Sequence, residues 1–358
     1  MLRPREAVLT LPAYHPPLAG RDGLRLDFNE NTVGCSSRVL ARLRQIAPDD
    51  LARYPERGPV EERVADFLGI ASPELLLTNG VDEAIHLLCE TYLEAGDEAL
   101  IVVPTYSMYR IYMMAAGAEV ISVAAGRDFR FPIEDLCNRI TERTRLIAIA
   151  NPNNPTGTVA REEELMRIVR AAPGAAVLVD EAYFEFYGQT VLSRRREFTN
   201  LFVARTFSKA YGLAGLRIGV LVGDANQMRA VRRVSSPYNV NAIAIACLPE
   251  ALRDQEYIQK YVAEVRESRA RLEHALEAAG VRFWPSQANF VLARVGAAAA
   301  FVEGMRRREI LVRDRSSDHG CGGCVRITLG PREHADRMLA AVQETLDEIG
   351  IAQGVSRR

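Results

Sequence analysis

The sequence predicts an α/β protein in which a doubly wound, mostly parallel sheet is joined to a smaller α+β domain. Three observations predict this fold: short apolar runs, helical patterns between them, and a change of pattern after about residue 245. The runs have the length of buried parallel strands, which are covered on both faces. They lie at 75–78, 99–103, 120–123, 145–150, 176–180, 201–204 and 216–222.

Helical periodicity separates these runs, as in VDEAIHLLCETYLEAG (81–96) and REEELMRIVRAA (161–172). After residue 245 the order changes to a long amphipathic helix, three further strands and two more helices. The expected segments are a helix at about 250–279, strands within 288–295, 310–314 and 325–330, a helix between the first two of these strands, and a closing helix at about 332–349.

The bulk composition describes an ordinary globular chain. It has 358 residues, 48 % of them hydrophobic and 25 % charged, and a net charge of −1. This balance gives no reason to expect a nucleic-acid or membrane partner. No run approaches the roughly 20 apolar residues of a membrane span. The first residues, MLRPREAVLTLPAYHPP, lack an apolar signal core, so we expect a cytoplasmic protein.

Six cysteines are present, and two of them form a CxxC motif in HGCGGCVRITLG. These are Cys321 and Cys324, with His319 just upstream. A zinc site usually needs four ligands, and a second motif of this kind is missing. We therefore interpret this segment as a glycine-rich loop and predict no metal site.

Polar and glycine-rich segments follow most of the predicted strands. In doubly wound sheets, ligands bind just beyond the carboxyl ends of the strands. Each segment has a structural explanation by itself, such as a turn or a helix cap, but together they predict a site. The segments are NGVDEAI (79–85), PTYSMY (104–109), NPNNPTG (151–157), DEAY (180–183) and RTFSK (205–209).

Lys209 is the most unusual residue of this set. Only two of the 45 basic residues are lysines, and Lys260 lies in a charged helical stretch typical of a solvated face. Lys209 instead lies among small and apolar residues. Because arginine is always charged, only a lysine can become an amine nucleophile. A Schiff-base lysine and a helix-end cation are the two interpretations open at this point.

Two of the segments are suited to an anion. Gly80 and Asp82 open a helix, whose first N–H groups can bind a phosphate, although Asp82 also suits an N-cap. Thr206, Ser208 and Arg217 add two hydroxyls and a guanidinium.

Other residues suit a heterocyclic cofactor. Asp180 ends an apolar strand, where a carboxylate is costly unless it is paired. Tyr183 and Asn154 can hydrogen-bond a ligand oxygen, and Tyr106 offers a flat ring for stacking. Pyridoxal phosphate uses all these parts: a lysine for its aldehyde, an anion site, a carboxylate for its ring nitrogen, and donors for its phenolic oxygen.

The ordered motifs resemble those of fold-type I pyridoxal-phosphate aminotransferases. Within this superfamily the chain is most similar to the histidinol-phosphate aminotransferases. The resemblance covers nearly the whole chain. It is carried by LPAYHPP, LDFNENTVG, RYPE, TNGVDEAI, PTYSMY, NPNNPTG, VDEAYFEF, TFSKAYGLAGLRIG, PYNVN, ANFVL, LVRDRS and VRITLG.

The resemblance implies a division into domains and a set of cofactor contacts. Residues 38–248 would form the large domain, and 1–37 with 249–358 the small domain and N-terminal arm. Lys209 would bind the cofactor aldehyde and move a proton, and Asp180 would pair with the ring nitrogen. The other implied contacts are Asn154 and Tyr183 with the phenolic oxygen, Tyr106 with the ring, and Gly80, Val81, Asp82, Thr206, Ser208 and Arg217 with the phosphate.

The resemblance also implies a homodimer and a substrate pocket. Tyr54 would reach the cofactor phosphate in the neighbouring subunit. Arg326 would hold the substrate carboxylate or phosphate, and Tyr14, Asn29, Arg313 and Tyr238 match positions near the substrate. The implied reaction exchanges the amino group between L-histidinol phosphate and 2-oxoglutarate, in histidine biosynthesis.

Alternatives remain open at the level of the substrate. LDFNENTVGCS and SSDHGCGGC depart from the family's usual pattern on the expected substrate side. Aromatic amino acid aminotransferases and phosphothreonine decarboxylases are the nearest alternatives. A cofactor-sensing regulator would need a nucleic-acid-binding module, and a plain nucleotide-binding protein would need a GxGxxG or Walker loop; neither motif is found.

Overall fold

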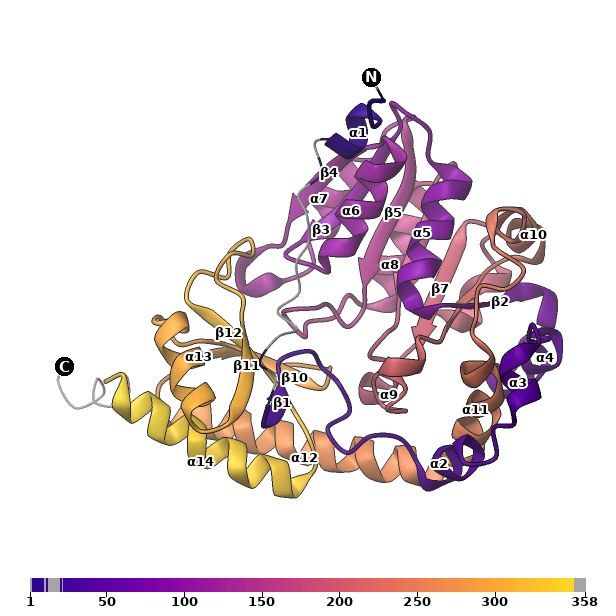
Figure 1. Cartoon of the computed structure of the whole chain (residues 1–358). Coiled ribbons are helices and arrows are strands. Elements are labelled where there is room, and N and C mark those ends of the chain that lie inside the picture. Colours follow the sequence, from indigo (N-terminus) through magenta and orange to yellow (C-terminus); the bar gives the residue numbers. More distant parts are fainter. Residues whose placement is uncertain (1, 10, 12–19, 21, 351–358) are drawn as a thin grey trace.

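The computed structural model describes residues 2–9, 11, 20 and 22–350, and its strands form two sheets (Figure 1). The larger sheet has seven strands in the order β2-β8-β7-β6-β5-β3-β4. The strands of this sheet are β2 (Leu75–Thr78), β3 (Glu98–Val103), β4 (Glu119–Ala124), β5 (Thr144–Ala150), β6 (Ala176–Asp180), β7 (Leu201–Thr206) and β8 (Gly219–Val222).

Both faces of this sheet are buried at its central strands, as the uninterrupted apolar runs predict, whereas β4 at the edge is largely exposed or only partly buried. In β6, Val177 and Val179 belong to one hydrophobic cluster, whereas Leu178 belongs to the cluster on the opposite face. β5 alternates in the same way, with Ile147 in the first cluster and Leu146 in the second. This two-residue period is that of a strand covered on both sides.

Helices cover both faces and connect the parallel strands. α5, α6 and α10 pack together on the face that carries Leu178, and α8 packs on the opposite face. The helices of this part of the chain are α5 (Gly80–Tyr92), α6 (Ser107–Ala116), α7 (Ile133–Asn138), α8 (Glu162–Ala171), α9 (Phe184–Tyr187) and α10 (Ala225–Val234). Short 3-10 turns are η1 (Ser72–Glu74), η2 (Arg127–Phe129), η3 (Leu192–Arg196) and η4 (Ala214–Leu216).

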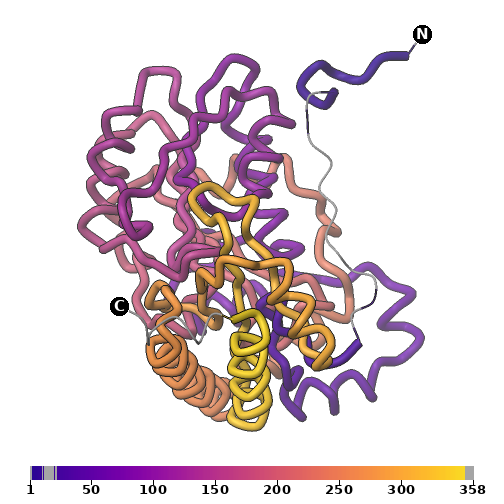
Figure 2. Tube along the Cα trace, turned by 90° about the vertical axis from the view of Figure 1, so that its left-hand side faces the viewer, coloured from indigo at the N-terminus to yellow at the C-terminus, as the bar shows by residue number. Residues whose placement is uncertain are grey.

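The smaller sheet has the strand order β1-β11-β12-β10-β9 and combines the two ends of the chain. Figure 2 shows two of its helices, α12 and α14, side by side. The strands are β1 (Leu24–Leu26), β9 (Arg282–Trp284), β10 (Phe290–Arg294), β11 (Ile310–Asp314) and β12 (Cys324–Thr328). The helices are α12 (Gln255–Ala278), α13 (Ala298–Arg307) and α14 (Arg332–Glu348).

The remaining helices lie outside the two sheets. α11 packs against α2, α3 and α4, and α1 packs against α6. Their bounds are α1 (Glu6–Leu9), α2 (Ser37–Leu43), α3 (Pro48–Ala52), α4 (Gly58–Leu68) and α11 (Ala242–Arg253).

The predicted α/β fold is confirmed, with three corrections in detail. The run at 216–222 is a strand only from Gly219, and β8 is antiparallel to both neighbours rather than parallel. The long helix at 250–279 is two helices, because Asp254 leaves the helical region (φ −98°, ψ 58°). β1 and β9 were not predicted, since three residues are too few to show a period. The domain boundaries at 38–248 stay a prediction.

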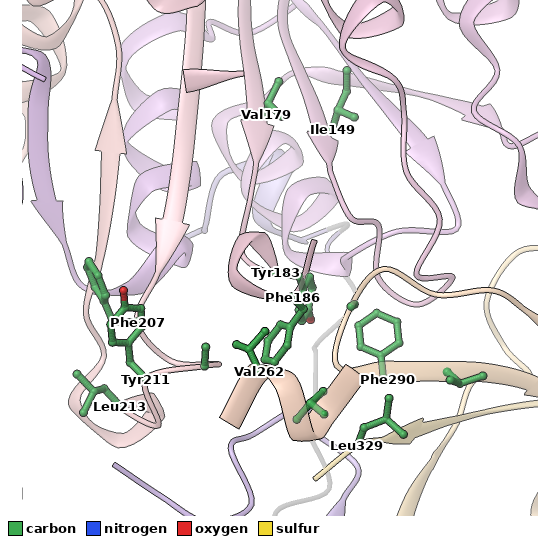
Figure 3. Close-up of a cluster of buried hydrophobic side chains, with 14 of the residues drawn as sticks. Ile149, Val179, Tyr183, Phe186, Phe207, Tyr211, Leu213, Val262, Phe290 and Leu329 are labelled. Atoms are coloured by element: carbon green, nitrogen blue, oxygen red, sulfur yellow. The ribbon is translucent and has the colours of Figure 1, made fainter. Parts of the chain in front are cut away.

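The core continues from the large sheet towards α12 and β10. Figure 3 shows Tyr183 and Phe186 between the ends of β5 and β6 and the side chains of Val262 and Phe290. The rings of Tyr183 and Phe290 meet edge to face, with centroids 5.2 Å apart. This packing fixes the small sheet next to the carboxyl ends of the large sheet's strands.

Candidate active site

A cavity of about 600 Å³ lies at the carboxyl ends of the large sheet's strands and is closed by residues of the small sheet. It gathers side chains from widely separated parts of the sequence. The predicted site residues that line it are Asn29, Val81, Asp82, Tyr106, Asn154, Asp180, Tyr183, Thr206, Ser208, Lys209, Arg217, Arg313 and Arg326.

Lys209 follows β7 and points its ammonium group into a buried environment. Its Nζ donates a hydrogen bond to the carbonyl oxygen of Phe28 at 3.1 Å. Burial and the nearby guanidinium of Arg326 lower the pKa of Lys209 to about 8. A lowered pKa increases the fraction of neutral amine, which is the form that acts as nucleophile or base.

Asp180 is buried at the last position of β6. It accepts hydrogen bonds from the Tyr109 hydroxyl at 2.5 Å and from the Ala182 amide at 3.0 Å. Burial raises the pKa of Asp180 to about 6, against the opposing effect of these two donors. Among the described residues no cation pairs with this carboxylate. A protonated ring nitrogen would supply the missing positive partner.

Tyr109 lines the cavity and contacts Asp180, although the sequence did not single it out. It is completely buried and lies one helical turn after Tyr106 on α6. That i, i+3 spacing in PTYSMY places the two rings on one helix face, where they meet edge to face at 5.8 Å. The spacing was therefore the signal that could have identified Tyr109.

Arg217 lines one end of the cavity and Gly80 lies beside it; we name this the anion-binding end after the role predicted for these residues. Gly80 has φ +74°, and a Cβ there would lie 2.7 Å from Nη2 of Arg217. Arg217 itself has φ +53°, a strained conformation for a residue with a side chain. Its Nη2 lies 3.0 Å from Oδ2 of Asp82, which holds the guanidinium beside the start of α5.

Buried hydroxyls and Tyr106 complete this end. Thr206 and Ser208 are both buried, and the Ser208 amide donates to Thr206 Oγ1 at 3.1 Å. Tyr106 donates its hydroxyl to Asp82 Oδ1 at 2.8 Å, which fixes the orientation of its ring.

Asn29 connects the N-terminal segment to both sheets. Its Nδ2 donates to the Tyr183 hydroxyl at 2.9 Å, and its Oδ1 accepts from Thr328 at 3.0 Å. The backbone of Asn29 has φ +56°. Because strained backbone persists only where the surroundings impose it, these contacts support a role in orienting Tyr183.

Arg326 on β12 is buried, with only 5 % of its surface exposed. It donates to Asn154 Oδ1 and to the Asp27 carbonyl oxygen, both at 2.6 Å. Neither partner carries a charge, so the positive charge of Arg326 is not neutralised by them. Burial and the neighbouring Arg315 and Arg313 lower the pKa of Arg326 to about 10.

Tyr54 and Tyr238 do not line the cavity of this chain. They are 74 % and 56 % exposed, and their rings stack with centroids 4.1 Å apart. The loop of Tyr238 is anchored by Asn239, whose Nδ2 donates to the Leu77 carbonyl oxygen at 2.9 Å. Their assigned roles stay predictions. Tyr14 lies outside the described residues.

The CxxC segment is a compact loop. Cys321 and Cys324 are buried against Trp284 and Phe129, and the Cys324 amide donates to the Cys321 carbonyl at 2.9 Å. Within residues 2–9, 11, 20 and 22–350, no group of three or more His, Cys, Asp or Glu side chains is placed to hold a metal ion. In the same part of the chain no helix is long and apolar enough to cross a membrane.

The arrangement fits pyridoxal phosphate. Lys209 lies between an anion-binding end at Arg217 and a guanidinium at Arg326, both of which influence its pKa. Asp180 supplies a buried carboxylate that has no cation partner among the described side chains. These features match the aldehyde, phosphate and ring nitrogen of this cofactor.

Comparisons with known proteins agree with this chemistry. Residues 21–342 match the model of the family "Aminotransferase class I and II". A histidinol-phosphate aminotransferase of Geobacillus sp. (strain WCH70) is 36 % identical over 337 residues, 91 % of each chain. Another, of Thermoanaerobacter sp. (strain X514), is 34 % identical over 90 % of this chain and 93 % of its own.

A solved structure supports the same family. The histidinol-phosphate aminotransferase of Sinorhizobium meliloti in complex with pyridoxal-5'-phosphate superposes with a TM-score of 0.88. It is 25 % identical, and the match covers 98 % of this chain and 99 % of that one. The chain therefore belongs to the aminotransferase class I and II family and is a fold-type I, pyridoxal-phosphate-dependent aminotransferase.

Proposed function

We propose that this enzyme transfers an amino group between L-histidinol phosphate and 2-oxoglutarate, as a step of histidine biosynthesis. The observation that carries the proposal is the guanidinium cluster across the cavity from the anion-binding end. Arg313 and Arg326 line the same cavity as Lys209. A guanidinium binds the forked oxygens of a carboxylate or a phosphate, so one pocket can receive both substrates.

The similar proteins support the choice of substrate. Relatives at 34–36 % identity over about nine-tenths of the chain are named histidinol-phosphate aminotransferases. 2-Oxoglutarate is the amino acceptor that we infer for the carboxylate half-reaction, with glutamate as the donor in the biosynthetic direction.

The residues of the cofactor end have separate roles in this proposal. The bound cofactor supplies a ring that accepts electrons from the substrate carbon. Asp180 holds a proton on the ring nitrogen, and Tyr183 and Asn154 orient the phenolic oxygen. Lys209 Nζ would take the proton from the substrate Cα and give it up again, as general base and then general acid.

The phosphate end holds the cofactor in place. Gly80, Val81 and Asp82 present the start of α5, and Thr206, Ser208 and Arg217 add hydroxyls and charge. Tyr106, whose ring orientation is fixed by Asp82, would offer its face to the ring of the bound cofactor. Asn29 positions Tyr183 through the hydrogen bond between them.

We further propose that the active unit is a homodimer in which Tyr54 reaches the partner's cofactor phosphate. The exposed Tyr54–Tyr238 stack supports this, because monomeric proteins seldom leave two adjacent aromatic rings uncovered. Mixing Y54A with K209A protein tests it. A mixed dimer would contain one site with both Lys209 and Tyr54, so activity should exceed that of either variant. No gain in a mixture shown to exchange subunits would contradict the role of Tyr54 in the partner's site, and a protein that does not form dimers would contradict the homodimer itself.

The visible spectrum of the purified enzyme tests the substrate. We expect a yellow protein whose colour bleaches when L-histidinol phosphate is added and returns with 2-oxoglutarate. A yellow protein that bleaches with glutamate but not with histidinol phosphate would exclude this substrate. Phenylalanine and O-phosphothreonine, added separately, then distinguish the two alternative activities.

A further inference from the structure

A third arginine lies beside the two that were assigned to the substrate. Arg313 and Arg326 are direct partners across the antiparallel pair β11–β12. Arg315 follows two residues after Arg313, so both side chains leave the strand on the same side. Its amide donates to the Cys324 carbonyl at 2.9 Å, which extends the pairing of the two strands to this residue. All three arginines line the cavity.

This grouping of guanidiniums destabilises the fold unless an anion lies nearby. Like charges directly opposite each other on a sheet destabilise it. Arg326 makes hydrogen bonds only with neutral oxygens, and the Arg313 guanidinium lies over the Phe28 ring at 5.4 Å. Such a concentration of positive charge in a buried place indicates an anionic ligand.

Asp318 is the carboxylate that belongs to this cluster. It forms an ion pair with Arg315 across a turn in which the Asp318 amide donates to the Arg315 carbonyl at 2.9 Å. Two further acidic residues, Asp27 and Glu30, line the cavity, and Glu30 has Arg25 at 3.8 Å. Counted by themselves, the three guanidiniums and the Asp318 carboxylate carry a net charge of +2.

The cluster also has unused hydrogen-bond donors. The Nε atoms of Arg315 and Arg326 are both buried and have no hydrogen-bond partner among the described residues. Leaving a buried charged donor unsatisfied is costly. Both side chains also line the cavity, where an anion with several oxygens can accept hydrogen bonds from the guanidiniums.

We propose that Arg315 is a specificity-determining residue that favours a phosphate dianion over a carboxylate at this end of the cavity. The inference rests on the proposed function, in which one half-reaction uses a phosphorylated amine and the other a dicarboxylate. A phosphate ester carries close to two negative charges at neutral pH and three free oxygens. It matches the excess charge, whereas a carboxylate with one charge and two oxygens leaves one guanidinium unmatched.

Asp318 has a complementary part in this arrangement. It holds Arg315 at the cavity wall and reduces the net charge that a carboxylate substrate meets. Its own carboxyl is buried, and burial raises its pKa while the adjacent Arg315 opposes this effect. Arg315 thus has its Nη2 on Asp318, while the side chain lines the cavity.

Replacing Arg315 with glutamine in the holoenzyme tests the proposal. We compare kcat/KM for histidinol phosphate with kcat/KM for glutamate, in single half-reactions followed by the bleaching of the cofactor. R315Q should lower the ratio of the two values by about tenfold or more, because a charge-assisted hydrogen bond to phosphate is lost. D318N should raise the ratio. R308Q, which removes an arginine paired with Glu344 outside the cavity, is the matched control and should leave the ratio unchanged.

R315Q leaves the Asp318 carboxylate without its partner, so folding could suffer. The double variant R315Q/D318N removes both charges and should still show a fall in the ratio, although a smaller one than R315Q because the loss of the Asp318 charge acts in the opposite direction. If either folded variant lowers both half-reactions in equal proportion, or changes neither, Arg315 only closes the turn and the proposal is wrong.

A second measurement separates this proposal from the choice of substrate. Inorganic phosphate and acetate are tested as inhibitors of the glutamate half-reaction of the holoenzyme, whose own phosphate site is filled by the cofactor. R315Q should weaken inhibition by phosphate about tenfold more than inhibition by acetate. If the wild type does not react with histidinol phosphate, the proposed function fails, and this comparison alone decides on Arg315. Equal weakening of both inhibitors would then overturn its role.

Discussion

The two ends of the cavity are built on different principles. The cofactor end consists of residues at or just after the ends of neighbouring strands of one mostly parallel sheet, such as Asp180 at the end of β6 and Lys209 after β7. The substrate end consists of arginines on β11 and β12 and the segment after β1, brought together from opposite ends of the chain. The first end would position a fixed cofactor, whereas in the proposed reaction the second would accept two anions in alternation.

The electrostatics of the two ends differ accordingly. At the cofactor end a carboxylate is buried without a cation, and the pKa of Asp180 rises to about 6. At the substrate end guanidiniums are buried without enough carboxylates, and the pKa of Arg326 falls to about 10. Each end is therefore complementary to a group of the opposite charge that enters with its ligand.

Lys209 lies where the two ends meet, so its removal should have the largest effect. K209A should lower turnover of both half-reactions by at least about 10⁴-fold, because the nucleophile and the general base are lost together. The measurement is the visible spectrum and the rate of each half-reaction. K260A, which removes the exposed lysine of α12, is the control. A K209A protein that stays yellow and active would refute the assignment.

Replacing Asp180 tests the cofactor end alone. D180A should retain some cofactor but lose about 100-fold or more in turnover, because the ring nitrogen loses the group that keeps it protonated. Both half-reactions should fall by the same factor, since both use the same ring. D180N keeps the shape of the side chain and separates loss of charge from loss of packing. Near-normal turnover in either variant would remove this role from Asp180.

Replacing Arg326 tests the substrate end. R326Q should lower kcat/KM by about 10- to 100-fold for histidinol phosphate and for glutamate, because both anions lose a charged donor. The colour of the resting enzyme should persist, because Lys209 and Asp180 are untouched. A colourless R326Q protein would show that the two ends are not separate, and the comparison between them would fail.

Sequence reasoning was most effective at the cofactor end. NPNNPTG, DEAY and SKAYGLAGLR each place a side chain by its position next to one strand, so a contiguous motif contains the necessary information. The fold class followed from the same alternation of strands and helices. Arg217 and Gly80 come from separate motifs, but each lies beside a strand end of the same sheet.

The substrate end was less predictable because its contacts are long-range. Arg326 bonds the Asp27 carbonyl, and Thr328 bonds Asn29, in each case across 299 residues of sequence. Arg315 was overlooked because its position depends on the pairing of β11 with β12, which the spacing of residues along one strand does not reveal. β1, with three residues, was too short to predict, although it leads into the segment that carries Asn29.

Replacing Tyr109 tests how the protein sets the pKa of Asp180, with the smallest expected effect of these variants. Its hydroxyl donates to Asp180 and so lowers the pKa of that carboxyl, whereas burial raises it. In Y109F the lowering contribution disappears, and the pKa of Asp180 should rise. Since the ionised carboxylate is the active form, the acid limb of the pH profile of kcat/KM should move to higher pH. At the pH optimum, turnover should fall by less than about tenfold, because a single hydrogen bond to a charged group is removed.

The matched control for Y109F is Y92F. Tyr92 donates its hydroxyl to Gln227 Oε1 at 2.9 Å and does not line the cavity, so its loss should leave the pH profile unchanged. An acid limb that stays in place in Y109F would mean that the cofactor's ring nitrogen alone sets the ionisation of Asp180. The pKa of Asp180 would then be set by the ligand rather than by the protein. In this respect the cofactor end would resemble the substrate end, where the incoming anion supplies the negative charge that balances the guanidiniums.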